Sequence, residues 1–309
     1  MRTKILSNLE NLLEHIEAKH YKINYDNSLK ITGYPFYFKI NFVNPNIVFT
    51  DEINSWSFKS DRLTLQSYPW LPNSLMINEG TNYHMSFNSL WDLSGKKIEG
   101  DIELNSAYII QNLRINLKNS SLKNDIFQQM QIGFFELSAT RDDTPDQKKI
   151  NWNLKIENFF VNNAFNNPLG QEIKTCIFNG ELNGTPEKLS FEGIQKWSKE
   201  GGILNINYMF LDWSPLWLEG NGTFAFDPNM QPLLAMTANI KGYNETIEKL
   251  KEAKLLKPTD SAIGQFLLSG LSNKNTEGQP EVKLSITIQQ GWFYLGPIKL
   301  FPIPQINWS

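Results

Sequence analysis

The stretch FYFKINF, residues 36–42, contains the pattern that decides the fold. Phe36, Phe38, Ile40 and Phe42 alternate with more polar residues, which is the period of a β-strand with one apolar face. A lone strand gains too little from burying such a face, because ordering its backbone costs a similar free energy. We therefore predict a strand whose apolar face is covered by a second sheet or by helices.

Two prolines flank this strand. Proline cannot donate a backbone hydrogen bond to a neighbouring strand, so it is confined to strand ends, edges and bulges. We predict that Pro35 marks the start of the strand and that Pro45, after Asn44, marks its end or a kink. A second short strand should follow through residues 47–49.

The same alternation returns along most of the chain. It is typical of half-buried antiparallel strands, and clusters of Asn, Ser, Gly, Asp and Pro between the runs predict turns. The runs are Ile98, Ile102 and Leu104; Leu113, Ile115 and Leu117; Trp152, Leu154 and Ile156; Leu204, Ile206, Tyr208 and Phe210; Leu234, Met236, Ala238 and Ile240; Val282, Leu284, Ile286 and Ile288. The predicted fold class is mainly β, with large curved antiparallel sheets in a sandwich or groove-like arrangement.

Helices are predicted in two places. Residues 1–22 carry apolar side chains at a spacing of three and four, which predicts an amphipathic helix. A late helix pair is predicted, the first helix from Asn244 to about Leu256 and the second from Thr259-Asp260 to about Leu271, with Pro258 separating the two. Asn244, and Thr259 or Asp260, are the candidate N-cap residues.

The predicted β-rich body covers residues 23–309. Its charged segment RDDTPDQKK, residues 141–149, predicts a solvated loop. The region 141–150 is therefore the candidate boundary between two β-halves.

Composition and charge exclude several classes of protein. With 29 basic and 32 acidic residues spread along the chain, the formal charge is −3, so no basic surface is expected for nucleic acid or anionic lipid. The lone Cys176 excludes an internal disulfide and a multi-cysteine metal site. No apolar run is long enough for a spanning helix, so the chain as given is expected to be soluble. No cofactor is predicted, because Gly220-Asn221-Gly222 lies inside a strand pattern and does not open a dinucleotide-binding turn.

Candidate catalytic residues are few. His15, His20 and His84 show no metal-ligand spacing. Asp101 and Glu103 share one face of a predicted strand, where carboxylates could act as acid and base, but a solvent-exposed face is the simpler interpretation. Asp142 and Asp143 fall in the charged loop. We predict that the protein is not an enzyme.

Aromatic residues form 13% of the chain. They either fill the core or line a groove that holds an apolar ligand, because ligand pockets are mostly apolar with few polar groups. The residues in question are Trp56, Phe58, Trp70, Trp91, Trp197, Trp213, Trp217, Trp292 and Phe293. Periodicity does not distinguish the two alternatives.

Four motifs together resemble the uncharacterised bacterial family DUF2125. They are Gly33-Tyr34-Pro35-Phe36, SYPWLPNSLMI from Ser67, WSKEGGILNINYMFLDWSPLWLEGNGTFAFD from Trp197, and GWFYLGPIKLFPIP from Gly291. The resemblance extends over roughly residues 20–304, and the order of the motifs is more specific than any one of them.

The resemblance implies a location and a class of function. Members look like Gram-negative envelope proteins, with an N-terminal membrane anchor before a periplasmic β-rich body whose strand pattern is similar to that of AsmA-like proteins. Residues 1–22 would then be a helix that follows an anchor absent from this chain. The native protein would be tethered to the inner membrane by that anchor. No catalytic residue is established for the family, so none is carried over.

The leading hypothesis is a non-enzymatic periplasmic protein that binds or guides lipid or another hydrophobic envelope component. Phe36, Phe38, Ile40 and Phe42 are its candidate ligand face. The alternative is a structural or adaptor protein that recruits envelope proteins through exposed edges and Trp-rich loops such as residues 67–72. A hydrolase acting on envelope polymers ranks last, because nothing in the sequence requires it. An enclosed apolar cavity would favour the first hypothesis over the second.

Overall fold

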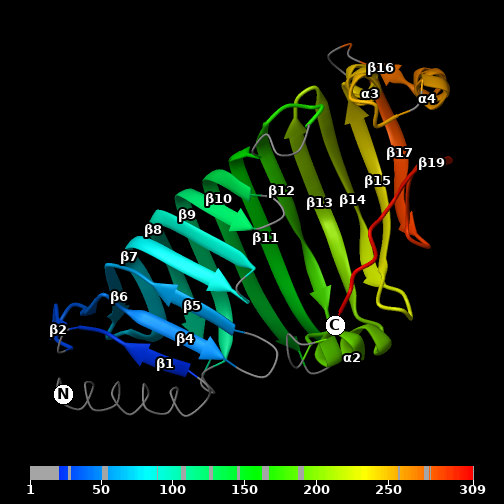
Figure 1. Ribbon diagram of the computed structural model, residues 1–309. Helices are drawn as coiled ribbons and strands as arrows, with labels where there is room; N and C mark the ends of the chain where they lie inside the picture. Colours follow the sequence, from blue (N-terminus) through cyan, green and yellow to red (C-terminus); the bar gives the residue numbers. More distant parts are fainter. Residues whose placement is uncertain are drawn as a thin grey trace. The chain divides into compact units, whose positions relative to one another are not determined.

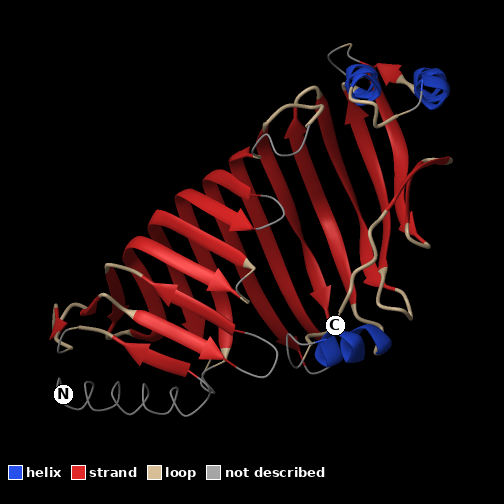
Figure 2. Cartoon of the chain, in the orientation of Figure 1, coloured by secondary structure: helices blue, strands red, loops and turns tan. Residues whose placement is uncertain are grey.

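The computed structural model describes strands β1–β19 and helices α2–α4 (Figure 1). It describes residues 21–308 except 27–28, 51–54, 89, 106–108, 125–127, 145–146, 162–166, 187–190, 257, 275–277 and 279. The predicted N-terminal helix, with His15 and His20, lies outside the described residues, and Tyr21 already belongs to β1. The predicted mainly β fold with antiparallel strand pairing is confirmed (Figure 2).

The chain forms two compact units. Unit 1 comprises Met1–Ala139 with Phe159–Ala164, and unit 2 comprises Thr140–Asn158 with Phe165–Ser309. Strands β10 (Gln128–Thr144) and β11 (Gln147–Phe160) contribute residues to both. The prediction of a solvated loop at residues 141–149 is wrong for most of its length, because both strands run on into this segment.

Unit 1 is organised around one long strand, β7 (Leu71–Phe87). Besides β7 and parts of β10 and β11, the unit contains β1 (Tyr21–Asn24), β2 (Ile31–Thr32), β3 (Phe38–Val43), β4 (Asn46–Thr50), β5 (Ser55–Lys59), β6 (Arg62–Tyr68), β8 (Trp91–Leu104) and β9 (Ile110–Asn124). One edge of β7 pairs with β8, which pairs with β9. The other edge pairs first with β6 and then with β5, so the sheet continues as two arms, β6-β3-β2 and β5-β4-β1.

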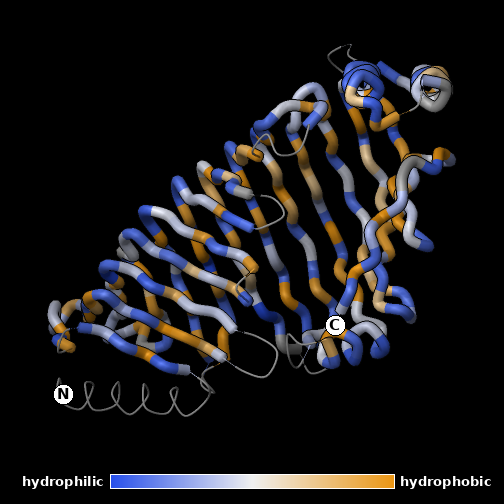
Figure 3. The backbone as a smooth tube through the Cα atoms, in the orientation of Figure 1, coloured by the Kyte–Doolittle hydropathy of each residue, from blue (hydrophilic) through white to orange (hydrophobic). Residues whose placement is uncertain are grey.

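The core of unit 1 is built from the predicted alternation. In the strand pairing, Phe42 lies opposite Leu63, and Ile98 lies opposite Leu117. These four side chains are buried in one apolar cluster with Tyr83 and its neighbours. Apolar and polar residues alternate along the strands, as Figure 3 shows. The pattern that predicted the strands is therefore also the pattern that fills the core.

Unit 2 combines a sheet with helices. Its elements are β12 (Glu172–Asn183), α2 (Phe191–Lys199), β13 (Ile203–Trp213), β14 (Leu216–Phe226), β15 (Pro232–Lys241), α3 (Tyr243–Glu252), α4 (Pro258–Leu271), β16 (Asn273–Lys274), β17 (Pro280–Gln289), β18 (Trp292–Leu295) and β19 (Ile298–Pro302). The strands pair in the order β12-β13-β14-β15-β17-β18-β19, with β16 on β17. Helices α3 and α4 lie together at one end of β15 and β17, and α2 lies at the opposite end (Figure 1).

The late helix pair is confirmed, but its predicted N-cap is wrong. Gly242 caps α3 without a side-chain hydrogen bond, and Asn244 is the second residue of the helix. Pro258 begins α4, which suits its fixed φ and missing N–H. The side chains of Thr259 and Asp260 lie outside the described part of the chain.

Helix α2 is an element that the sequence analysis missed. Its Trp197 is buried, and the indole Nε1 donates to the backbone carbonyl of Asn183 at 2.8 Å. Phe191, Ile194 and Trp197 recur at a spacing of three, which is the signal that could have identified it.

Candidate functional site

The start of α3 is fixed against the turn between β13 and β14. Gly242 has φ 68°, a left-handed conformation that glycine adopts without steric cost. A Cβ at this position would also overlap the backbone carbonyl of Pro215. Glycine therefore allows the chain to leave β15 and turn directly into α3 beside that turn.

The two helices present apolar side chains toward the sheet. On α3 these are Tyr243, Ile247 and Leu250, at helical spacing along one side. On α4 Leu268 does so, and Gly264, one turn earlier, lines the same space with its backbone. The added Cβ of a larger residue at Gly264 would meet only Ile247 Cδ1, at 3.8 Å, so space is open beside this glycine.

The sheet supplies the opposite wall. Ile240 of β15 lies across from Leu218 on β14 and from Val282 on β17, so three strands present branched aliphatic side chains side by side. Ile286 of β17 lies opposite Leu295 of β18 and extends the wall. All five side chains belong to the apolar core of unit 2.

An apolar cavity of about 510 Å³ lies between the helix pair and this wall. Its lining residues are Leu169, Leu216, Leu218, Ile240, Tyr243, Thr246, Ile247, Leu250, Leu255, Leu256, Ser261, Gly264, Leu268, Val282, Leu284, Ile286, Phe293, Leu295 and Ile298. Among these described residues there is no Asp, Glu, Lys, Arg or His. Leu255, which follows α3, is 63% exposed, so the cavity reaches the surface beside it.

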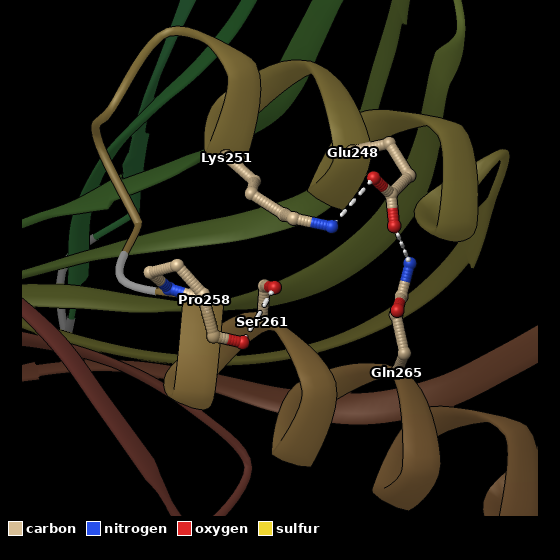
Figure 4. Close-up of polar contacts among 5 residues, drawn as sticks. All are labelled: Glu248, Lys251, Pro258, Ser261 and Gln265. Carbon is tan, nitrogen blue, oxygen red and sulfur yellow. Dashed lines mark hydrogen bonds and ion pairs between the residues drawn. The ribbon is translucent and has the colours of Figure 1, made fainter.

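Polar contacts join the outer sides of the two helices (Figure 4). Gln265 Nε2 of α4 donates to Glu248 Oε1 of α3 at 2.7 Å, and Lys251 Nζ lies 3.1 Å from Glu248 Oε2. The hydrogen bond from Gln265, followed by the interaction with Lys251, lowers the pKa of the Glu248 carboxyl. Ser261 Oγ donates to the carbonyl of Pro258 at 3.0 Å within α4.

The cavity has the size and chemistry of a binding site for a small apolar ligand. Ligand pockets have volumes of about 300–1,000 Å³ and mostly hydrophobic linings with few polar groups. Water gains few hydrogen bonds in such a space, so an apolar molecule is the favoured occupant.

Comparison with known proteins identifies the family. The family model described as "Uncharacterized protein conserved in bacteria (DUF2125)" matches residues 3–304. The chain belongs to the DUF2125 family. The searches of curated proteins and of solved structures found no match. The family resemblance seen in the sequence is thus confirmed, and the cavity lies within the matched region of this DUF2125 member.

The residues proposed from the sequence as a ligand face are not part of this cavity. Strand β3 begins at Phe38, and Phe36 lies in the preceding turn, where it is 69% exposed. Phe42 is buried in the core of unit 1, and Ile40 packs against that core. Phe38 stacks on Tyr34, with ring centroids 6.2 Å apart. Phe36 is separated from the other three residues because it belongs to the turn that contains Pro35, whereas the strand alternation begins at Phe38.

Most of the aromatic residues pack against other groups. Trp56 and Phe58 belong to the core of unit 1, whereas Trp70 is 64% exposed. Lys241 Nζ lies over the Trp217 ring at 4.1 Å. Among the aromatic residues singled out in the sequence, Phe293 lines the cavity.

The candidates Asp101, Glu103 and His84 lie on partly exposed strand surfaces. Asp101 forms an ion pair with Arg114, and Asn112 donates to Glu103 at 2.6 Å. His84 Nε2 lies 3.4 Å from Asp92 Oδ1, and both side chains are about half exposed. Within the described residues, no group of three or more His, Cys, Asp and Glu side chains could hold a metal ion.

The structure also shows the surroundings of the lone cysteine and of the glycines in Gly220-Asn221-Gly222. Burial raises the pKa of the Cys176 thiol to about 11, so the thiol stays protonated at neutral pH. Gly220 and Gly222 face the backbone of β15, where a Cβ would overlap the carbonyls of Thr237 and Ala235. No helix in the described part of the chain is long and apolar enough to cross a membrane.

Proposed function

We propose that this DUF2125 member is a non-enzymatic protein that binds a hydrophobic ligand, such as a lipid, in the cavity between the helix pair and the sheet of unit 2. The observation that carries this proposal is the apolar cavity of about 510 Å³ lined by five strands of the sheet and by both helices. The alternative role as an adaptor predicts a packed interior at this position in place of a cavity.

The composition of the cavity walls supports a ligand held by apolar contact. Each square ångström of apolar surface removed from water contributes about 25 cal/mol, so aliphatic chains gain most from entering. The exposed Leu255 beside the opening offers a first apolar contact to a ligand arriving from solvent or from a membrane surface.

The test is a substitution that fills the cavity while preserving the fold. In Gly264→Leu the new side chain extends into the open space beside Ile247, and leucine is also the better helix former. We expect affinity for a fluorescent acyl probe to fall at least about tenfold, which corresponds to roughly 1.4 kcal/mol. The melting temperature should stay the same or rise.

Gly270→Leu is the matched control on the same helix. A Cβ at Gly270 meets nothing within 4 Å, and the residue is exposed. This variant should bind the probe as the unmodified chain does. Equal binding by the Gly264 and Gly270 variants, together with no lipid in solvent extracts of the purified protein by mass spectrometry, would rule the proposal out.

A second candidate is a structural or adaptor role, favoured by exposed aromatic residues in unit 1. Phe36 and Tyr34 lie in the turn before β3, and Trp70 and Leu71 lie at the turn between β6 and β7. β3 pairs with β6 from Phe38 and Ser67 onward, so the two turns lie at the same end of these strands. A photo-crosslinker at residue 70 that captures no protein in cells would count against this role.

We place the proposed binding activity in the periplasm, on a chain tethered to the inner membrane. The support is the resemblance of the sequence motifs to envelope proteins. Fractionation of cells that produce the full-length native protein tests the location, because a periplasmic chain is digested by protease only after the outer membrane is opened.

A further inference from the structure

The cavity reaches solvent at the connection between the two helices. Of the lining residues that the structure describes, Leu255 alone is exposed, and the others are buried or half-buried. Leu255 follows α3 and precedes Pro258, the first residue of α4. A molecule bound in the cavity therefore meets water beside Leu255.

The surface next to this opening is charged, whereas the interior is not. Lys251, Glu252 and Lys254 come just before Leu255 and are exposed to solvent. The described lining residues include no charged side chain. Moving a charged or strongly polar group into such an interior without a partner is costly. The polar head group of a lipid would therefore stay in water beside Leu255, and only its apolar tail would enter.

The volume of the cavity limits the number of tails. A methylene group in a liquid alkane occupies about as much space as a water molecule in liquid water, roughly 30 Å³. The volume of about 510 Å³ therefore holds a chain of at most about 17 carbons. One long acyl chain fits this space, whereas the two long chains of a membrane phospholipid exceed it.

Gly264 lies deeper in the cavity than the opening does. It comes six residues after Pro258 in α4, which places it about 9 Å further along the helix axis. The space beside Gly264 is open, because an added Cβ would meet only Ile247 Cδ1 at 3.8 Å. A tail that enters beside Leu255 would therefore reach Gly264 only when it is several carbons long.

We propose that the cavity holds the tail of a single-chain amphiphile, such as a fatty acid or a lysophospholipid. The tail runs along α4 past Gly264, and the polar head group stays at the surface beside Leu255. This inference rests on the proposed function, because it names the class of ligand and its orientation in the same cavity.

The first experiment varies the length of the tail. Lysophosphatidylcholines from octanoyl to stearoyl, each below its critical micelle concentration, displace a fluorescent apolar probe from the unmodified chain. Affinity should rise roughly fourfold for each added methylene that enters the cavity. The rise should level off by the stearoyl chain, which exceeds the volume limit.

Gly264→Leu shortens the space available to the tail. The leucine side chain adds four carbons beside Ile247, so this variant should bind the octanoyl compound almost as the unmodified chain does. Its affinity for the palmitoyl compound should fall at least about tenfold, because the end of that tail no longer fits. Gly270→Leu, on the exposed side of α4, is the matched control and should bind every chain length as the unmodified chain does.

The second experiment determines the orientation of the ligand. A bimane label is attached to Lys254→Cys, next to the opening, and Cys176 does not compete for the label because its thiol stays protonated at neutral pH. A lysophospholipid with a nitroxide near the head group should quench the bimane more strongly than one with a nitroxide at the end of its tail.

Four outcomes would overturn the inference while leaving the proposed function intact. They are a bound probe that no lysophospholipid displaces, an affinity independent of tail length, an equal loss at every tail length in Gly264→Leu, and stronger quenching by the nitroxide at the tail end. If the probe itself does not bind to the unmodified chain, the proposed function fails and this inference fails with it.

Discussion

Gln265 on α4 donates a hydrogen bond to Glu248 on α3 at 2.7 Å, on the outer side of the helix pair that forms one wall of the cavity (Figure 4). Lys251 approaches the other carboxylate oxygen from α3 itself. The two partners of Glu248 therefore differ in role, since Gln265 joins the helices and Lys251 neutralises the charge.

This contact predicts an acid-sensitive helix pair. The pKa of Glu248 is lowered from its ordinary value of 4.5, chiefly by the hydrogen bond from Gln265. A group whose pKa is lower in the folded state stabilises the fold above its unfolded pKa, and this contribution is lost as the pH falls through the folded pKa. Glu248→Gln should therefore lower the melting temperature slightly at pH 7, and the difference should be smaller at pH 3.

Hydrogen exchange across residues 243–271 at the two pH values measures this effect locally. Glu252→Gln, on the exposed side of the same helix, is the matched control and should leave the exchange of α4 unchanged. A Glu248→Gln effect of the same size at pH 7 and pH 3 would contradict a role for the ionised carboxylate.

Alternation of apolar residues was sufficient to predict the strands, because period two has one structural solution when one face is buried. The alternation correctly predicted that Val282, Leu284 and Ile286, which line the cavity, lie on one face of a strand. It failed within β13, where the pairing register shifts between Ile206 and Met209. After this irregularity Met209 and Leu211 pack against the core, so Tyr208 and Phe210 leave the predicted face.

The cavity itself could not be predicted from the sequence. Its walls combine α3 and α4 with residues of β14, β15, β17, β18 and β19, and the empty volume depends on how far the helices stand from the sheet. A filled core and a lined cavity require the same aliphatic pattern. Gly264 is a local signal that could have indicated the cavity, because a glycine within a helix that packs on a sheet leaves space beside it.

Gly242→Ala should destabilise unit 2. Alanine in the left-handed region costs about 1–2 kcal/mol, and its Cβ would in addition overlap the carbonyl of Pro215. Urea denaturation followed by circular dichroism measures the loss. Gly201→Ala, also at positive φ but with nothing within 4 Å of the added Cβ, is the control and should lose only the conformational part.

Phe42→Ala and Phe36→Ala should differ sharply in stability. Phe42 is 5% exposed and packs in the core of unit 1, so its truncation should cost about 3–5 kcal/mol. Phe36 lies exposed in a turn, and its truncation should change the free energy of unfolding by no more than about 0.5 kcal/mol. Similar losses in the two variants would show that Phe36 is covered in solution.

The buried pair Tyr83 and Ser120 provides a last prediction, on the stability of unit 1. The phenol and hydroxyl oxygens lie 2.6 Å apart and both residues are almost fully buried. Burial raises the pKa of Tyr83, so the phenol stays protonated and can donate. Ser120→Ala leaves that phenol without this partner and should cost about 1–3 kcal/mol in urea denaturation.

The double variant separates this hydrogen bond from packing. Tyr83→Phe removes the phenol oxygen while the ring keeps its place over Gly95, where the Tyr83 ring leaves no room for a larger residue. Once the phenol oxygen is gone, Ser120→Ala should lower the free energy of unfolding by little more. The sum of the losses in the two single variants should therefore exceed the loss in the double variant. Strictly additive losses would mean that each side chain acts through packing alone and that the 2.6 Å contact contributes nothing to stability.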